Sequence, residues 1–292
     1  MVSGAPKPLL RPAKHCQEIH GDSGLDGTDG NHSLPPCSAG FMARWNAEQK
    51  GRKAVPEMYR LIREHYEATG GQQRVTIVAT GSLTNVALAI AVYGDDLREA
   101  LDGIVFMGGS VRAGGNTGIV AEFNIQTDPE AAQLVIDSNI PVTMVPLDLT
   151  HTVLVTDDVI DRIRRVSFDH DTSSIQYGST PHGSTPPPDR LQSVITRTID
   201  LLTFFATTYK SVFGFSAPPL HDPVAIAFLA DPSIFTATNL FVSIETHNPL
   251  SAGQTIVDLH AVTPHPPNVL VAHTVDVDAF WNLLLDALRA SL

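Results

Sequence analysis

Residues 75–109 read VTIVATGSLTNVALAIAVYGDDLREALDGIVFMGG, and this stretch decides the fold class. The β-branched run Val75–Thr80 predicts a buried strand, and Ile104–Met107 predicts a second one. Between them Gly81 turns the chain into an amphipathic helix over Leu83–Val92. Two strands joined by a helix form a crossover unit, which predicts that the strands are parallel.

The alternation of helices and short apolar strands continues on both sides of this unit. A helix over about 55–69 precedes it, and a helix that opens with Asp128 as N-cap and Pro129 follows it. The sequence therefore predicts an α/β fold with an open, mainly parallel sheet flanked by helices. Further elements are expected as strands over Val142–Leu147, Leu240–Glu245 and Thr255–Leu259, and as helices over Leu191–Phe213 and Val277–Leu288.

Length and composition fit a globular chain with one core. The chain has 292 residues, of which 43% are hydrophobic, and no domain boundary is visible, so we expect a single domain over 1–292. A polar stretch at about 169–190 is rich in Pro, Ser and Gly, which predicts a flexible insert.

Charge and cysteine content exclude several classes of protein. The net charge is −12, from 31 acidic and 19 basic residues, which argues against nucleic acid and anionic membranes as partners. Cys16 and Cys37 are too few for a disulfide framework or a zinc cluster. With no apolar run of ~20 residues and no signal-like apolar segment, the sequence predicts a cytoplasmic protein without a membrane span.

The first candidate site is the glycine-rich segment after the strand at 104–107. Ligands of parallel sheets bind outside the carboxyl ends of the strands, so Thr80, Met107 to Asn124 and Leu147 to Thr150 are the positions of interest. Glycines let the backbone approach a ligand, while Asn and Glu side chains offer the donors and acceptors that sugar hydroxyls require. A surface loop with turn residues explains the same pattern and, for a single stretch of this kind, is the commoner case.

The second candidate site is His221-Asp222, which stands between prolines at a helix start. Fixed φ angles hold both side chains, as a proton donor beside a metal ligand would need, but an Asp at a helix start is also a routine cap. Phe205 and Tyr209 lie one helical turn apart and form either an aromatic wall or part of the core. His20 lies in a glycine-rich loop and is open to both interpretations.

Other chemistries lack their sequence signals. Neither a phosphate-binding GxxxxGK[ST] loop nor a GxGxxG after the first strand is present. A GxSxG elbow and an HExxH helix are missing as well, which leaves a serine hydrolase, a dehydrogenase or a zinc protease without support.

Eight segments together resemble the nucleoside hydrolase family, the inosine–uridine-preferring nucleoside N-ribohydrolases. The resemblance implies an open α/β fold with a Ca²⁺ ion at the carboxyl edge of the sheet. It also implies hydrolysis of the ribosyl N-glycosidic bond to ribose and free base, in purine or pyrimidine nucleoside catabolism. The segments are IHGDSGLDG (19–27), VATGSLTNVALA (78–89), IVFMGGSVRAGGN (104–116), AEFNIQTDPEAA (121–132), VTMVPLDLTH (142–151), FFATTYKSVFGF (204–215), PPLHDPVAIA (218–227) and AGQTIVD (252–258).

The resemblance also implies roles for individual residues. Asp222 looks like a carboxylate ligand of Ca²⁺, Thr80 like a ligand through its backbone carbonyl, and His221 like the proton donor to the leaving base. The groups expected around the substrate are Asn116, Glu122 and Asn124 at the ribose hydroxyls, Met107 and Phe123 beside them, and Phe205, Tyr209 and His20 around the base.

One departure from the family limits these expectations. The family begins with a strand that ends in an aspartate cluster of the form DxDxxxDD, which supplies further Ca²⁺ ligands and the catalytic base, and this sequence contains no such cluster. We therefore expect an N-terminally truncated fold, unless another chain or a longer natural product supplies the missing strands. Because Ca²⁺ usually takes 6–8 oxygen ligands, we predict weak Ca²⁺ binding, slow or no hydrolysis, and low solubility from exposed apolar surface.

Two questions stay open from the sequence. A non-catalytic nucleoside- or sugar-binding relative would carry the same ribose-binding residues without the base. Members of the family commonly form dimers or tetramers, so the resemblance allows a homo-oligomer, and it leaves purine or pyrimidine preference undecided.

Overall fold

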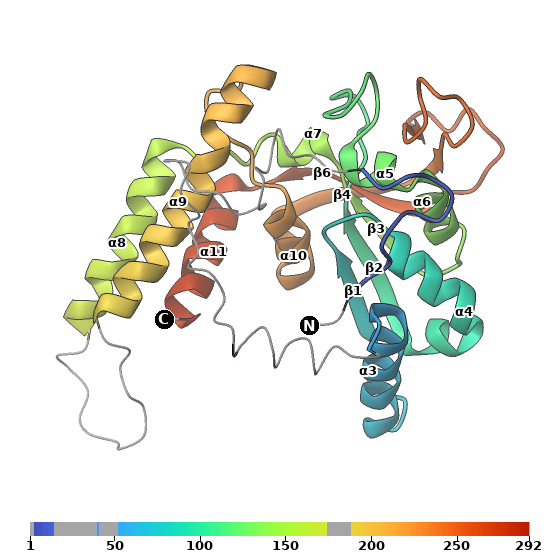
Figure 1. The fold of residues 1–292 in the computed structure, drawn as a ribbon, viewed down its shortest axis with the longest axis horizontal. Coiled ribbons are helices and arrows are strands. Elements are labelled where there is room, and N and C mark those ends of the chain that lie inside the picture. The colour runs from blue at the N-terminus through green and yellow to red at the C-terminus, as the bar shows by residue number, and fades with distance from the viewer. Residues whose placement is uncertain (1–2, 15–39, 41–51, 174–187, 292) are drawn as a thin grey trace. The chain divides into compact units, whose positions relative to one another are not determined.

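The computed structural model describes residues 3–14, 40, 52–173 and 188–291 (Figure 1). The chain forms two compact units. Unit 1 comprises residues 1–14, 37–151 and 221–275 and contains the sheet, whereas unit 2 comprises 15–36, 152–220 and 276–292 and is helical in its described part.

Unit 1 contains a six-stranded sheet in the order β1-β2-β3-β6-β4-β5. The pairs β1–β2, β2–β3 and β3–β6 are parallel, while β4 pairs antiparallel with both β6 and β5. This confirms the predicted open, mainly parallel sheet. The strands are β1 (Val75–Ala79), β2 (Leu101–Met107), β3 (Val142–Val145), β4 (Phe235–Ile244), β5 (Thr255–Asp258) and β6 (Val269–Val275).

Helices cover both faces of this sheet, as Figure 1 shows. On one face α4 packs against α3 and α6, and on the other face α10 packs against β1 and β2. Short elements α5 and α7 follow the carboxyl ends of β2 and β3. The bounds are α3 (Ala54–Ala68), α4 (Thr84–Ala100), α5 (Phe123–Thr127), α6 (Pro129–Ile136), α7 (Leu147–Thr150), α10 (Asp222–Ala230) and the 3₁₀ turn η1 (Pro232–Ile234).

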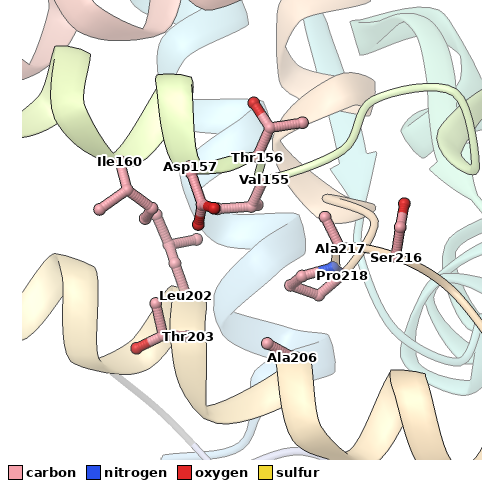
Figure 2. A pocket seen from close by; sticks show the side chains of 10 residues that line it. All are labelled: Val155, Thr156, Asp157, Ile160, Leu202, Thr203, Ala206, Ser216, Ala217 and Pro218. Carbon is pink, nitrogen blue, oxygen red and sulfur yellow. The ribbon is translucent and has the colours of Figure 1, made fainter.

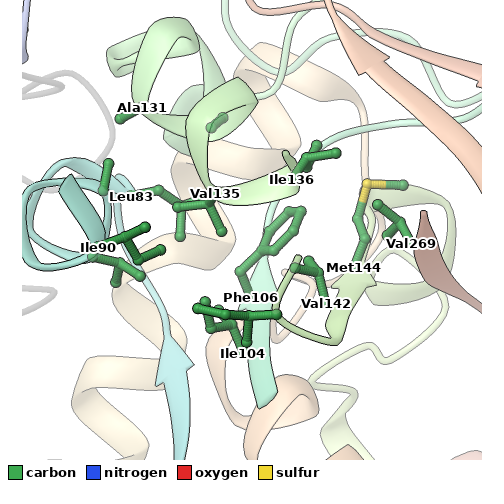
Figure 3. Packing of buried hydrophobic residues seen from close by; sticks show 14 of the residues in the cluster. Leu83, Ile90, Ile104, Phe106, Ala131, Val135, Ile136, Val142, Met144 and Val269 are labelled. Atoms are coloured by element: carbon green, nitrogen blue, oxygen red, sulfur yellow. The ribbon is translucent and has the colours of Figure 1, made fainter. Parts of the chain in front are cut away.

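The core of unit 1 lies between the sheet and α4 and α6 (Figure 3). Ile104 and Phe106 of β2 point into this cluster and are fully buried. Their neighbours Val105 and Met107 alternate to the opposite face, where α10 covers the sheet. Burial of a large apolar side chain stabilises a fold by roughly 1.5–3 kcal/mol, so packing on both faces stabilises β2 as the buried strand that leads to the candidate loop.

The structure differs from the predicted elements of unit 1 in several places. The strand expected over 142–147 ends at Val145, because Pro146 has no N–H for the sheet and instead precedes the one-turn helix α7. The helix expected to end at Val92 continues to Ala100, with a kink at Gly94, whose φ is +50°. Strand β6 was not predicted at all, although Val269–Val275 is rich in β-branched residues.

Unit 2 is built on α8 (Asp157–Ser173), α9 (Pro188–Phe213) and α11 (Val277–Ser291). Helix α8 packs against both α9 and α11, and Ile163 and Trp281 are fully buried. The insert expected at about 169–190 is partly helical, because α8 runs to Ser173 and α9 begins at Pro188, a residue well suited to the first turn. Residues 174–187 lie outside the described residues.

No helix in the described ranges is both long enough and apolar enough to cross a membrane. The division into two units concerns contacts within the chain, and the single domain expected over 1–292 stays a prediction.

Candidate active site at the carboxyl edge of the sheet

The predicted site residues of unit 1 follow the carboxyl ends of β1, β2 and β3 or begin α10. Thr80 comes directly after β1 and is exposed, and Met107 is the last residue of β2. Because parallel strands end at the same edge, the loops that follow them meet there. Helix α10 packs on β1 and β2, so its start belongs to the same part of unit 1.

The loop after β2 is held against the neighbouring strands. Gly109 has a φ of +78°, and a Cβ at this position would lie 2.8 Å from Cγ2 of Thr255, so only glycine fits. The backbone N–H of Ser110 donates to the Thr255 hydroxyl at 2.9 Å. The close approach of the loop to β5 thus depends on the absence of a side chain at Gly109.

Asp148 of α7 fixes the next part of this loop. Its carboxylate accepts the backbone N–H groups of Val111 at 2.6 Å, Arg112 at 2.7 Å and Ala113 at 3.0 Å. Three successive amides that point at one carboxylate form an anion-binding concavity, which is filled here by the protein itself. The loop therefore has a defined path toward Asn116.

Glu122 is a buried carboxylate that organises the end of the loop. It is 2% exposed and accepts the backbone N–H groups of Gly109, Asn124 and Ile125 at 2.9–3.1 Å. Burial outweighs these three hydrogen bonds and raises the pKa of Glu122 to about 7. Both carboxylate oxygens accept hydrogen bonds, and through the N–H groups of Asn124 and Ile125 Glu122 is the N-cap residue of α5.

Two asparagine amides flank Glu122 with half of their hydrogen-bonding groups in use. Asn124 Nδ2 donates to the carbonyl of Met107 at 3.0 Å, and Asn116 Oδ1 accepts the backbone N–H of Phe123 at 2.9 Å. An amide has both an acceptor oxygen and a donor NH₂ group, and within the described ranges the other end of each amide forms no hydrogen bond. The structure thus brings Met107, Asn116, Glu122, Phe123 and Asn124 together, and their role at the ribose hydroxyls stays a prediction.

The start of α10 places the second candidate pair. His221 is the N-cap residue and Asp222 the first helical residue, so the cap is not the aspartate considered from the sequence. Oγ1 of Thr150, a fully buried residue of α7, lies 2.7 Å from His221 Nδ1. The ring of His151 meets the His221 ring edge-on, with centroids 5.7 Å apart.

Asp222 differs from the other carboxylates of the site in its surroundings. Asp222 as a whole residue is exposed to solvent. Its carboxylate is nevertheless partly surrounded by protein, and this desolvation raises the pKa of Asp222 to about 6. Within the described ranges no donor forms a hydrogen bond or ion pair with it. The negative charge of Asp222 also contributes to the raised pKa of Glu122, so the two carboxylates lie close enough to interact.

The residues expected around the base are not tested at this edge. Tyr209 belongs to unit 2, where it is 8% exposed and packs edge-on against Phe215 with centroids 6.0 Å apart. Phe205 lies in α9 of the same unit, and its side chain is outside what the structure describes. His20 also lies outside the described residues.

The donors at this edge fit only part of a Ca²⁺ site. Asp222 offers a carboxylate whose charge no described group neutralises, and Thr80 offers a backbone carbonyl, both of which suit a hard cation. Among the residues that the structure describes, no group of three or more His, Cys, Asp or Glu side chains is arranged to hold a metal ion. The two predicted ligands fall short of the 6–8 oxygens that Ca²⁺ usually takes.

A separate pocket of about 290 Å³ lies within unit 2 (Figure 2). Its walls come from the start of α8, from α9 and from the segment 216–218, and the side chains of Ile160 and Leu202 form an apolar side. The lining residues include none of the predicted site residues. They are Val155, Thr156, Asp157, Ile160, Leu202, Thr203, Ala206, Ser216, Ala217 and Pro218.

Three residues of the site were not singled out from the sequence, namely Asp148, Thr150 and His151. They lie in and directly after α7, in a segment that the sequence had marked by its place after a predicted strand and by the family resemblance of residues 142–151, without a role for any of the three. Their contacts with the glycine-rich loop and with His221 join residues 35–71 positions apart. Contacts between segments so far apart in the chain cannot be predicted from local sequence patterns.

Comparison with known proteins gives one consistent family. The family model described as inosine-uridine preferring nucleoside hydrolase matches residues 1–282. A probable ribonucleoside hydrolase of Dictyostelium discoideum is 37% identical over 288 residues, which cover 99% of this chain and 76% of that protein. The pyrimidine-specific ribonucleoside hydrolase RihA of Shewanella sp. (strain MR-7) is 36% identical over 289 residues, covering 99% and 77%.

Solved structures agree on the fold. A purine-preferring ribonucleoside hydrolase from Gardnerella vaginalis superimposes with a TM-score of 0.71 at 23% identity, over 98% of this chain and 78% of that one. The fold and the edge site thus define an α/β protein of the nucleoside hydrolase type. The chain belongs to the inosine-uridine preferring nucleoside hydrolase family.

Proposed function

We propose that this protein hydrolyses the N-glycosidic bond of ribonucleosides to ribose and free base. The observation that carries the proposal is that α7 contacts both candidate segments: Oγ1 of Thr150 lies 2.7 Å from Nδ1 of His221, and Asp148 accepts backbone N–H groups of the loop that leads to Asn116. These contacts support a common site for the asparagine and glutamate cluster of the loop and the imidazole–carboxylate pair of α10. Family membership over nearly the whole chain supports the same reaction.

The reaction breaks the bond between C1′ and a base nitrogen while water adds to C1′. Positive charge develops on the sugar in an oxocarbenium-like transition state, and carboxylates near the ribose stabilise it. The departing nitrogen needs a proton, which His221 supplies. Asn116 and Asn124 bind ribose hydroxyls through the amide groups that their backbone hydrogen bonds leave over.

We propose that Asp222 and the Thr80 carbonyl hold a Ca²⁺ ion at this edge. When bound, such an ion would orient the ribose diol and increase the acidity of a bound water. These two ligands alone give weak binding, so we expect this chain by itself to hydrolyse nucleosides slowly.

A second candidate function is non-catalytic nucleoside binding. The side chains of Asn116, Glu122 and Asn124 would bind ribose in the same way, and the sequence has no DxDxxxDD cluster to supply a catalytic base. The two functions differ in turnover and agree in ribose binding, which makes them separable by experiment.

The test combines ribose release with calorimetry on uridine and inosine, because relatives include pyrimidine-specific and purine-preferring enzymes. Ribose release that is lost in His221→Ala, with binding retained, supports the hydrolase. Heat of nucleoside binding without ribose release favours the binding protein. Absence of both overturns the proposal, and Ca²⁺ titration of the wild type and Asp222→Asn tests the metal ligand separately.

A further inference from the structure

Strand β1 forms one edge of the sheet in the part of the chain that the structure describes (Figure 1). It pairs there with β2 alone, in a regular parallel register from Thr76 to Ala79. All five residues of β1 are half-buried, whereas six of the seven residues of β2 are buried. The backbone groups on the outer side of β1 therefore have no strand partner among the described residues.

The sequence of β1 lacks the features that protect an edge strand from pairing with another chain. Exposed edges usually carry charged side chains or proline, and β1 reads VTIVA, without either. The strand at the opposite edge, β5, is one residue shorter and ends in an aspartate. Of the two edges, β1 is thus the better template for a further strand.

Helix α10 adds exposed apolar surface next to this edge. It packs on β1 and β2, and every residue that follows Asp222 in the helix is apolar. Ile226 and Leu229 lie three positions apart on one side of the helix and are 55% and 47% exposed. A helix that is apolar all round is expected to be covered all round.

Unpaired charges of opposite sign stand toward the two ends of β1. Arg74 directly precedes the strand and is exposed, and no group in the described ranges bonds with its guanidinium. At the carboxyl edge, α10 begins with Asp222, whose carboxylate also has no described partner. An antiparallel copy of β1 would bring Arg74 of one chain opposite Thr80 of the other, toward Asp222, and would do so twice. A parallel strand would bring like ends together.

We propose that two copies of this chain form a dimer through their β1 edges, with the strands antiparallel and the two Ile77 residues opposite each other. The two-fold axis then runs perpendicular to the joined sheet, so that both α10 helices lie on the same face of it. The pairing uses one surface twice and closes after two copies. It is independent of the proposed hydrolysis, because it concerns the edge of the sheet and needs no substrate.

The first test is analytical ultracentrifugation of the full chain over about a hundredfold range of concentration. We expect a monomer–dimer equilibrium in the wild type. Thr76→Lys places two ammonium groups near the centre of the paired strands and should raise the dissociation constant at least about tenfold. Ile256→Lys is the matched control on the opposite edge strand and should leave the dimer unchanged.

Three results of this experiment would overturn the proposal. They are a wild type that stays monomeric, a dimer that dissociates in Ile256→Lys but persists in Thr76→Lys, and an open series of larger species, which a closed two-fold pair does not produce. Far-UV circular dichroism establishes that each variant is folded.

The second test uses charge and spares the strand itself, in case Thr76→Lys does not fold. Arg74→Glu should weaken the dimer about tenfold at low salt and less at high salt, because it replaces an attraction to Asp222 with a repulsion. Arg165→Glu makes the same change of charge at an exposed arginine of α8 and should have no effect. Equal effects of the two variants, or none from Arg74→Glu, would contradict the antiparallel arrangement.

Amide hydrogen exchange locates the interface. Protection of residues 75–79 should increase with protein concentration in the wild type and should not do so in Thr76→Lys. Protection that is independent of concentration would place the dimer contact elsewhere and refute the pairing of β1 edges.

Discussion

The carboxylates of the loop after β2 and the carboxylate at the start of α10 differ in how many hydrogen bonds they accept. In the loop region Glu122 and Asp148 each accept three backbone N–H groups. At the start of α10, by contrast, Asp222 forms no hydrogen bond with any described group, and burial alone raises its pKa to about 6. Glu122 and Asp148 therefore stabilise the loop, whereas we expect the carboxylate of Asp222 to bind a ligand.

This difference teaches how the two kinds of residue can be told apart. A carboxylate whose lone pairs are filled by the backbone stabilises the fold, and its loss leaves buried donors without partners. A desolvated carboxylate without a donor is unfavourable for the fold and is expected where a cation or a developing positive charge binds. Stability measurements should therefore separate them.

Glu122→Ala should have the largest effect. It removes the acceptor of three N–H groups, two of them fully buried, and should lower the free energy of unfolding by about 4 kcal/mol. Urea denaturation measures this, with Glu99→Ala as the control, because the Glu99 side chain is largely exposed. A loss below 1 kcal/mol would remove the distinction between the two regions.

The pH dependence of stability should show the second largest effect. Below pH 4.5 Glu122 is protonated in both the folded and the unfolded chain, whereas between pH 4.5 and about 7 only the unfolded chain ionises. Stability should therefore fall by about 3 kcal/mol as the pH rises through this window and level off above it. Urea denaturation from pH 4 to 8 should show this fall in the wild type and a smaller one in Glu122→Gln. Equal slopes would assign the pH dependence to other groups.

Asp148→Ala should have an intermediate effect. Two of the N–H groups that Asp148 accepts belong to exposed residues, Arg112 and Ala113, which water can solvate after the change. We expect a loss of about 2 kcal/mol in the free energy of unfolding. Amide exchange of residues 111–113 should rise strongly in this variant, and unchanged protection there would argue against Asp148 as the anchor of the loop.

Asp222→Asn should have the smallest effect on stability and a large one on ligand binding. Since the desolvated charge of Asp222 is unfavourable for the fold, its removal should leave the free energy of unfolding at pH 7 unchanged or raise it, whereas the exposed Asp102→Asn should change it by no more than about 0.5 kcal/mol. Ca²⁺ and nucleoside affinity, measured by calorimetry, should fall in Asp222→Asn only. A marked loss of stability would place Asp222 with the structural carboxylates.

Much of the site could be predicted from the sequence, because residues that share a loop keep their order. Asn116, Glu122, Phe123 and Asn124 follow one predicted strand, and the structure gathers them with Met107 as expected. Thr150 and Asp148 were not singled out, because their partners lie 35–71 positions away in the chain. Their side chains acquire a role only when β3 and α10 are brought to the same edge.

The sequence by itself determined the α/β class, the parallel crossover unit of β1, α4 and β2, and the glycine-rich character of the loop after β2, but not strand β6. Periodicity and chain order suffice for these features, because they depend on neighbours along the chain. Only the tertiary structure decided which carboxylates are filled by backbone donors and which one is left open. That outcome depends on desolvation and on hydrogen bonds between distant segments, neither of which has a local signal.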